Sequence, residues 1–303
     1  MTEPSEIRAC PGEVQHLCPG LRVVLAPNPS PMTLHGTNSY IVGEGRVAVI
    51  DPGPADPRHL AALLAALAPG ETVSHILVTH AHLDHAPLAR PLAETTGAPV
   101  LAFGNATAGR SALMSRLAAE GGIEGGEGVD AGFVPDITLA DGAVVAGDGF
   151  RLTALHTPGH FGNHLSFEWE GAVFCGDHVM GWASSLISPP DGDMGAYMAA
   201  LDRLAGHGAG RLYPGHGDPV ADPARRIAEI AAHRRAREAA IRTALADGPS
   251  DATELARRIY TDTPPALMRA AARNVLAHLL DLTERNLAEP LGPLSARARF
   301  RAI

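Results

Sequence analysis

The length and composition of the chain indicate a soluble globular protein with a large core, because 46% of its 303 residues are hydrophobic and its mean hydropathy is +0.03. Its net charge is −9 and the sequence contains no lysine, which excludes Schiff-base chemistry on a lysine side chain. No apolar run is long enough for a membrane helix, and Met1–Pro4 lack the pattern of a signal peptide, so we expect a cytoplasmic protein without a membrane partner.

The first hundred residues alternate short apolar segments with a helical pattern. Strands are expected over residues 21–25, 39–42, 47–50 and 75–78. Asp56 as N-cap and Pro57 at the first helical position predict a helix over residues 58–67. This strand–helix–strand order predicts parallel pairing, and it places the loop after the fourth strand at the carboxyl edge of a sheet, where α/β folds keep their sites.

That loop contains three histidines and one aspartate within six residues. They are His80, His82, Asp84 and His85. Alternate side chains of an extended segment share a face, so the first three can converge, and a turn is needed to bring His85 to them. Pro87 suits the first position of a helix over residues 88–94, which supplies such a turn. We interpret this motif as a cluster of metal ligands.

The middle of the chain begins with a glycine-rich segment over residues 104–132, around one expected helix over residues 110–119. Either a lid over the site or a surface loop without a role agrees with this composition. Short apolar segments separated by Asp/Gly turns then predict an antiparallel meander. They cover residues 136–139, 143–146, 151–155, 165–169 and 172–175.

Three more candidate ligands stand at strand ends in the second half of the chain, each directly after a glycine. They are His160, Asp177 and His216. A preceding glycine lets the backbone turn sharply and bring the side chain back over the end of the sheet. With the first motif they make seven ligands of the types that divalent metals use.

The last part of the chain differs in charge and in pattern. Residues 1–222 hold 10 arginines against 24 acids, whereas residues 223–303 hold 14 arginines against 9 acids. Helices are expected over residues 223–245, 255–260 and 266–287, followed by a hairpin that includes the alternating tail 297–303. We therefore predict a small winged-helix-like module over residues 223–303, and for it we expect packing or dimerisation rather than direct nucleic-acid binding.

The seven ligands, in their order and spacing, resemble those of the metallo-β-lactamase superfamily. Residues 34–40, 176–181 and 233–238 resemble the β-lactamase-like protein 2 group within it, and the likeness extends over nearly the whole chain. It implies an α/β fold: a four-layer αβ/βα sandwich over residues 1–222 with the helical, winged-helix-like module behind it. One departure is that Ala86 and Pro87 follow His85 where the family often has glycines, which alters the pocket floor and removes no ligand.

The resemblance also implies roles for the residues of the site. His80, His82 and His160 would bind a first metal, Asp84, His85 and His216 a second, and Asp177 would bridge the two. Two divalent ions, zinc in the first place with iron or manganese as alternatives, would acidify a shared water to hydroxide near neutral pH. Asp84 is the expected catalytic group that orients or deprotonates this water, and Asp51 either orients a ligating histidine or caps its own loop. Tyr40, His164 and Trp182 are the candidates for substrate contacts.

The function expected from this site is a dinuclear, zinc-type hydrolase of a small thioester, lactone or related ester. The main alternative is a metal-dependent endoribonuclease acting on single-stranded RNA, which the likeness and the arginine-rich end suggest. The acidic catalytic part and the absence of an aromatic–basic stripe weigh against RNA. A regulator with a DNA-binding winged helix is disfavoured by the complete ligand set, and the ligand types leave a mononuclear iron oxygenase open.

Overall fold

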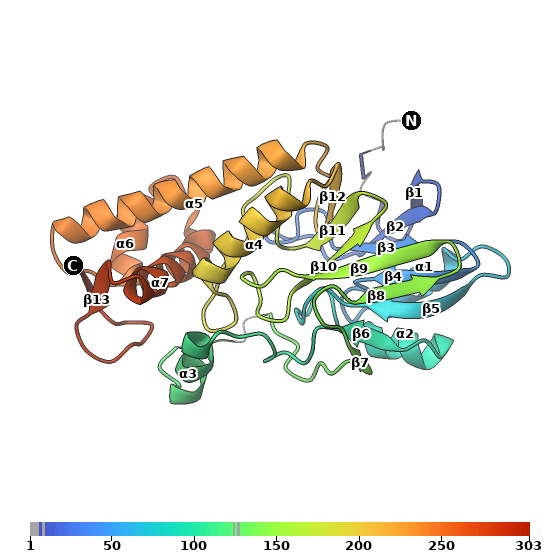
Figure 1. The fold of residues 1–303 in the computed structure, drawn as a ribbon, viewed down its shortest axis with the longest axis horizontal. Coiled ribbons are helices and arrows are strands. Elements are labelled where there is room, and N and C mark those ends of the chain that lie inside the picture. The colour runs from blue at the N-terminus through green and yellow to red at the C-terminus, as the bar shows by residue number, and fades with distance from the viewer. Residues whose placement is uncertain (1–5, 8–9, 124, 126–127) are drawn as a thin grey trace.

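The computed structural model describes residues 6–7, 10–123, 125 and 128–303, so the expectation for Met1–Pro4 falls outside the described residues. In this part of the chain two β-sheets face each other and helices cover their outer faces (Figure 1). None of the described helices is long and apolar enough to cross a membrane.

The first sheet contains seven strands in chain order, antiparallel from β1 to β4 and parallel from β4 to β7. They are β1 (Val14–Cys18), β2 (Leu21–Leu25), β3 (Asn38–Val42), β4 (Arg46–Ile50), β5 (Thr72–Leu77), β6 (Val100–Ala102) and β7 (Ile137–Thr138). Helix α1 (Pro57–Ala65) joins the parallel strands β4 and β5, as predicted. The histidine motif therefore leaves the sheet at the carboxyl end of β5.

The second sheet contains five strands in the order β12-β11-β10-β9-β8. They are β8 (Val144–Gly147), β9 (Phe150–His156), β10 (Leu165–Trp169), β11 (Ala172–Gly176) and β12 (Arg211–Pro214). Strands β8 to β11 form the predicted antiparallel meander, and helix α4 (Met194–His207) leads to β12, which lies parallel to β11.

The assignment of residues 136–139 to this meander is wrong. Strand β7 instead extends the first sheet by pairing in parallel with β6. The Asp136 carboxylate fixes this position, because it accepts a hydrogen bond of 2.8 Å from the backbone nitrogen of Val100 at the start of β6. This hydrogen bond joins residues that are 36 positions apart in the sequence, and with the pairing to β6 it holds β7 in the first sheet.

The two faces of each sheet bury different side chains, because successive residues of a strand point to opposite sides. On β4, Ala48 and Ile50 pack against the second sheet, whereas Val47 and Val49 pack with α1 and with α2 (Ala89–Thr96). Helix α4 and the next helix, α5 (Pro223–Ala246), cover the outer face of the second sheet. The layers are therefore helix, sheet, sheet and helix, which confirms the predicted four-layer sandwich.

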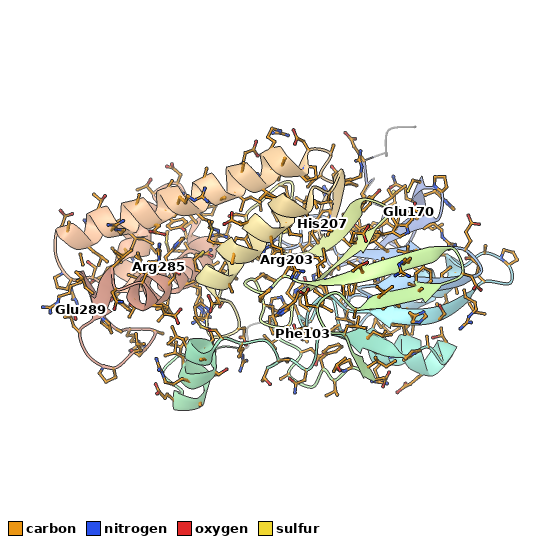
Figure 2. The ribbon with its side chains drawn as sticks, viewed as in Figure 1. Phe103, Glu170, Arg203, His207, Arg285 and Glu289 are labelled. Atoms are coloured by element: carbon orange, nitrogen blue, oxygen red, sulfur yellow. The ribbon has the colours of Figure 1, made fainter. Side chains whose placement is uncertain are left out.

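The chain after β12 forms the C-terminal helices and a two-stranded sheet. These elements are α5 (Pro223–Ala246), α6 (Ala252–Ile259), the 3-10 helix η1 (Pro265–Leu267), α7 (Met268–Glu284), β13 (Ala288–Pro290) and β14 (Phe300–Ala302). Asp251 and Glu254 form a capping box at the start of α6. Arg285, labelled in Figure 2 at the end of α7, forms ion pairs with Glu238 of α5 and with Asp281. The division into two domains after residue 222 stays a prediction.

Helix positions differ from the predictions in several places: α4 was not predicted, and α6 begins at Ala252 instead of residue 255. Pro87 precedes α2 instead of opening it, because Leu88 is the N-cap residue. The predicted helix over residues 110–119 is α3 (Ala112–Glu120), capped by the Ser111 side chain and packed into the hydrophobic cluster of the C-terminal helices. Of the glycine-rich segment around it, residues 124, 126 and 127 lie outside the described residues, and its role as a lid stays a prediction.

Candidate metal centre

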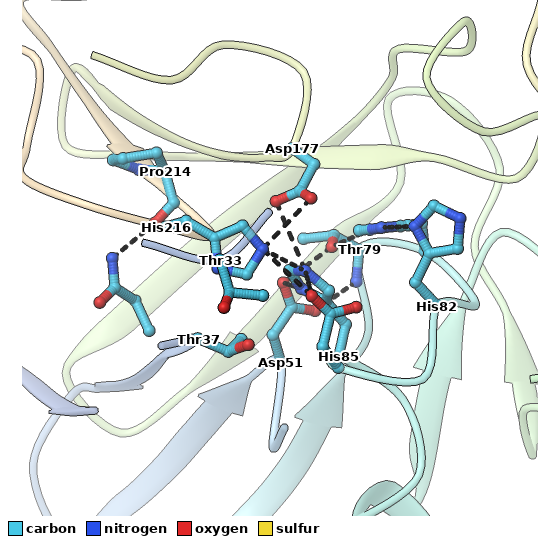
Figure 3. A network of polar contacts seen from close by, with 12 residues as sticks. Thr33, Thr37, Asp51, Thr79, His82, His85, Asp177, Pro214 and His216 are labelled. Atoms are coloured by element: carbon cyan, nitrogen blue, oxygen red, sulfur yellow. Dashed lines mark hydrogen bonds and ion pairs between the residues drawn. The ribbon is translucent and has the colours of Figure 1, made fainter. Parts of the chain in front are cut away.

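Four loops at one edge of the sandwich carry the candidate ligands. The histidine motif follows β5, His160 follows β9, Asp177 follows β11 and His216 follows β12. The structure brings all seven side chains together in two groups, and the ligand atoms of each group lie within 4.8 Å of one another. The first group is His80, His82 and His160, and the second is Asp84, His85, Asp177 and His216. Figure 3 labels His82 of the first group and His85, Asp177 and His216 of the second, whose side chains point toward one region from separate loops.

In the first group three imidazole nitrogens point at one another. The Nδ1 atom of His82 lies 2.8 Å from Nε2 of His80 and 3.1 Å from Nε2 of His160. Burial lowers the pKa of all three rings, that of His82 to about 3, so they are neutral at physiological pH. Neutral imidazoles are the form that binds metals, and one cation would satisfy all three nitrogens at once.

In the second group two imidazoles lie among two carboxylates. Nε2 of His216 is 3.2 Å from Oδ2 of Asp84 and 3.3 Å from Oδ2 of Asp177, and Nε2 of His85 is 3.4 Å from Oδ1 of Asp177. Burial opposes ionisation of the carboxyls, yet the histidines hold the pKa of both Asp84 and Asp177 below its usual value. Two ionised carboxylates therefore lie where a second cation would compensate their charge.

The outer ring nitrogens show that these side chains fit metal ions. Nδ1 of His85 lies 2.9 Å from Oδ2 of Asp51. Nδ1 of His160 lies 2.7 Å from the carbonyl oxygen of Leu186, and Nδ1 of His216 lies 3.1 Å from that of Gly36. Each oxygen accepts a hydrogen bond from the Nδ1–H group, which assigns the tautomer and leaves the Nε2 lone pair directed at the centre. Oδ1 of Asp177 is buried without a hydrogen-bond partner among the described residues, which is the condition of an atom that a cation would coordinate.

The charge state of the second group predicts how metal binding depends on pH. Burial opposes protonation of His216, but Asp177 and Asp84 raise its pKa to about 9, and the carboxylates raise the pKa of His85 as well. Protons therefore compete with metal at the second group below pH of about 9, whereas the lowered pKa values of the first group leave its ligands free. We expect about two metal ions per chain after dialysis at pH about 9 and about one at pH about 6, by elemental analysis. Loss of both ions over the same pH range would contradict this prediction.

Asp51 contacts a candidate ligand, as one of its two predicted roles requires, and its side chain caps the start of the histidine motif instead of its own loop. Its buried carboxylate accepts hydrogen bonds from the backbone nitrogen and the hydroxyl of Thr79, each at 2.7 Å, and from Nδ1 of His85 at 2.9 Å. It therefore holds the start of the motif and the orientation of one candidate ligand at the same time.

Replacing Asp51 with asparagine should weaken metal binding about 10- to 100-fold. The asparagine NH₂ group would face a hydrogen-bond donor where the carboxylate now accepts, so at least one of the three contacts would be lost. Chelator competition with the purified protein measures this affinity. Asp148→Asn is the matched control, because Asp148 is exposed in a turn away from the site. Equal metal affinity in the Asp51→Asn and Asp148→Asn proteins would contradict the orienting role.

Two of the three glycines before the candidate ligands turn the chain as predicted, and the third serves a different purpose. Gly159 and Gly176 have φ values of 137° and 45°, in the region that favours glycine, and they turn the chain before His160 and Asp177. Gly215 has no such torsion, but a Cβ there would lie 2.5 Å from Oδ1 of Asp177. Its missing side chain is what makes room for the candidate ligands.

The candidates for substrate contacts lie in different surroundings. Tyr40 is buried in the core, and its hydroxyl donates to the Pro214 carbonyl oxygen at 2.7 Å. His164 is also buried, behind the ring of His80 at 5.2 Å between centroids. Both positions favour a structural role and offer no surface to a substrate. Trp182 is 37% exposed beside Gly217, next to a candidate ligand, and its contact with substrate stays a prediction.

Sequence reasoning missed three groups that hold the candidate ligands in place. Two are the backbone carbonyls of Gly36 and Leu186, which no side-chain pattern reveals because every residue has a carbonyl. The third is the hydroxyl of Thr79, whose oxygen lies 2.9 Å from Nδ1 of His80. The position of Thr79 directly before the motif was the one sequence signal that could have indicated this contact.

A four-layer αβ/βα sandwich that gathers histidines and aspartates at one edge defines a class of metal-dependent hydrolases. The family model of the Metallo-beta-lactamase superfamily matches residues 32–216, and that of the Beta-lactamase associated winged helix domain matches residues 252–292. The chain belongs to the metallo-β-lactamase superfamily, as the resemblance implied. It is a hydrolase of that superfamily with a histidine and aspartate cluster suited to two metal ions.

Two curated relatives and one solved structure show how far the similarity extends. The Beta-lactamase-like protein 2 homolog of Drosophila melanogaster is 30% identical over 273 residues, 86% of each chain. The Lactamase-like protein nscB of Neosartorya fischeri is 34% identical over 71% of this chain, which spans only 58% of that relative's length. A metallo-β-lactamase family protein from Thermus thermophilus has a TM-score of 0.76 at 29% identity, covering 95% of this chain and 100% of that one.

Proposed function

We propose that the protein is a dinuclear, zinc-type hydrolase that cleaves a small thioester, lactone or related ester. The observation that carries this proposal is the position of Asp177, whose carboxylate lies 3.8 Å from Nε2 of His160 in the first group and 3.3 Å from Nε2 of His216 in the second. A carboxylate shared in this way suits two ions close enough to act on one water. His80, His82 and His160 would hold the first ion, Asp84, His85 and His216 the second, and Asp177 both.

The chemistry of such a site is hydrolysis without a covalent intermediate on the protein. Bound divalent ions supply a hydroxide near neutral pH and polarise the scissile carbonyl. Asp84 is the most accessible carboxylate of the cluster, with 27% of its side chain exposed against 10% for Asp177, so it can orient an entering water and accept its proton. Water adds to the acyl carbon and the C–S or C–O bond breaks, which gives a carboxylic acid and a thiol or alcohol, or a single hydroxy acid where the substrate is a lactone.

The arginines of the C-terminal part favour a small substrate over RNA. Several of them are engaged in ion pairs within the chain: Arg258 with Asp247, Arg299 with Glu254, Arg301 with Glu289, and Arg285 with Glu238 and Asp281. Arginines paired in this way offer less charge to phosphates than the excess of 14 arginines over 9 acids suggests. Cleavage of single-stranded RNA remains the alternative that the experiment must include.

One screen tests the proposal. Zinc-loaded protein is assayed with thioesters, lactones, β-lactams and single-stranded RNA, next to the same protein after chelation of its metal. We expect turnover of at least one thioester or lactone, which is lost on chelation and regained on adding zinc, with about two ions per chain by elemental analysis. RNA cleavage that weakens with rising salt, without ester hydrolysis, would establish the alternative. Absence of bound metal would refute both.

A further inference from the structure

Residues 180–190, here called the carbonyl segment, connect the metal centre to the C-terminal helices. The Leu186 carbonyl oxygen of this segment accepts the Nδ1 proton of His160 at 2.7 Å and so sets the angle of that ring. Ser185 donates from its hydroxyl to the backbone oxygens of Asp177 and His178. A shift of this segment would therefore move one candidate ligand of the first group and the backbone that carries the shared carboxylate.

Two arginines of helix α5 form hydrogen bonds to the backbone of this segment. Arg226 donates to the carbonyl oxygens of Met180 and Ala183, both at 2.8 Å. Arg234, two turns further along the helix, donates to the carbonyl oxygen of Ser185, directly before Leu186. The backbone on one side of the orienting carbonyl is thus fixed by α5.

Helix α7 forms a hydrogen bond to the residue that follows the same carbonyl. Oδ1 of Asn274 accepts a hydrogen bond from the backbone nitrogen of Ile187 at 3.0 Å and another from Nη1 of Arg234 at 3.2 Å. The Leu186 carbonyl is therefore held between two residues whose backbones are bonded to Arg234 and Asn274, and these two side chains are bonded to each other. These linked hydrogen bonds restrict the orientation of the Leu186 carbonyl group.

The environment of Arg234 is costly for a residue that only packs. The side chain is 1% exposed, lies over the Tyr197 ring at 5.3 Å, and forms no ion pair with a carboxylate among the described residues. A buried charge without a counter-charge reduces stability, so an apolar residue would pack a helix here at lower cost. What the guanidinium adds is directed donors: Nη1 donates to Asn274 and Nη2 to the carbonyl segment.

We propose that Arg234 and Asn274 are positioning residues of the metal centre, which act through the Leu186 carbonyl on the ring of His160. Helices α5 and α7 then help to orient a candidate metal ligand, in addition to packing against the sandwich. This inference rests on the metal centre of the proposed function and is independent of the substrate, so its test measures metal binding and uses no substrate.

Asn274 allows a matched set of variants, because both of its contacts are accepted by one oxygen. Asn274→Ala removes that oxygen, whereas Asn274→Asp keeps it and retains both acceptor contacts. Arg235→Ala is the control on α5, since Arg235 is exposed. Zinc is titrated into metal-free protein against a chelator. We expect Asn274→Ala to bind one of the two ions about 10-fold more weakly, and Asn274→Asp and Arg235→Ala to bind both like the unaltered chain.

A second background separates positioning from general loosening of the structure. In a His160→Ala protein the ring is already gone, so adding Asn274→Ala should not weaken zinc binding further. Arg234→Lys, which keeps the charge but loses the fork of donors, should reproduce the selective loss if Asn274→Ala does not fold. Equal affinities in Asn274→Ala and the unaltered chain, or the same loss in the His160→Ala background, would overturn the inference. An unaltered chain that binds no zinc would instead refute the proposed function, and this inference with it.

Discussion

Replacing His82 with alanine is expected to lower kcat/KM for hydrolysis at least about a thousandfold, the largest effect of any single substitution that we predict. His82 stands between the other two rings of the first group, with its Nδ1 close to both of their Nε2 atoms. Without it, two neutral imidazoles remain to hold an ion that contributes several kcal/mol to the barrier reduction, and each 1.4 kcal/mol corresponds to a factor of about ten. Elemental analysis should find about one ion per chain in place of two.

The effect of His82→Ala must be separated from a loss of folding. The ring of His82 is only partly buried at the edge of the sandwich, so the core should persist, and thermal unfolding of the metal-free proteins checks this. His207→Ala is the matched control, because His207 is exposed at the end of α4 (Figure 2). Full activity of the His82→Ala protein with two bound ions would refute the assignment of this group.

The candidate ligands could be found from the sequence because their signals are local. A strand followed at once by alternating histidines places those side chains at the end of a sheet, whatever the rest of the chain does. A glycine before His160 and before Asp177 marks a turn for the same local reason, and both glycines have the expected backbone torsions. What these signals could not give is which loops meet, and only the resemblance to a known family supplied that arrangement.

Helix α4 had local signals that the sequence analysis did not use. Asp193 caps its start, Gly208 ends it in the left-handed conformation, and its buried residues recur at helical spacing. They are Met194, Tyr197, Leu201 and Leu204, along one face of the helix. Every element of this helical pattern is present in the sequence, so α4 is predictable from local signals alone.

Other features depend on contacts that are distant in sequence. Strand β7 is held in the first sheet by Asp136 and β6, and no property of its two residues distinguishes a meander strand from an edge strand. The Leu186 carbonyl meets His160 only after α5 and α7 have folded over the carbonyl segment. The charge asymmetry of the C-terminal part was visible in the sequence, but the ion pairs that engage several of its arginines were not.

Asp177→Asn is expected to disable the centre by a route different from that of His82→Ala. The carboxylate of Asp177 approaches His85, His160 and His216, at distances between 3.3 and 3.8 Å, and so contacts both groups. An amide has one acceptor oxygen in place of two and carries no charge, so it cannot serve both groups. We expect kcat/KM to fall by about 10²- to 10³-fold, a loss of about 3 to 4 kcal/mol, with reduced occupancy of the second group.

The metal-free form of the same variant offers a readout that needs neither metal nor substrate. Burial opposes protonation of His216, and Asp177 is the chief cause that raises its pKa to about 9. Removing this charge should lower that pKa, which an NMR titration of the imidazole resonances measures directly. Asp202→Asn, on the exposed side of α4, should leave the resonance unchanged. A pKa of His216 that stays near 9 in Asp177→Asn, together with two bound ions and full activity, would mean that Asp177 does not couple the two groups.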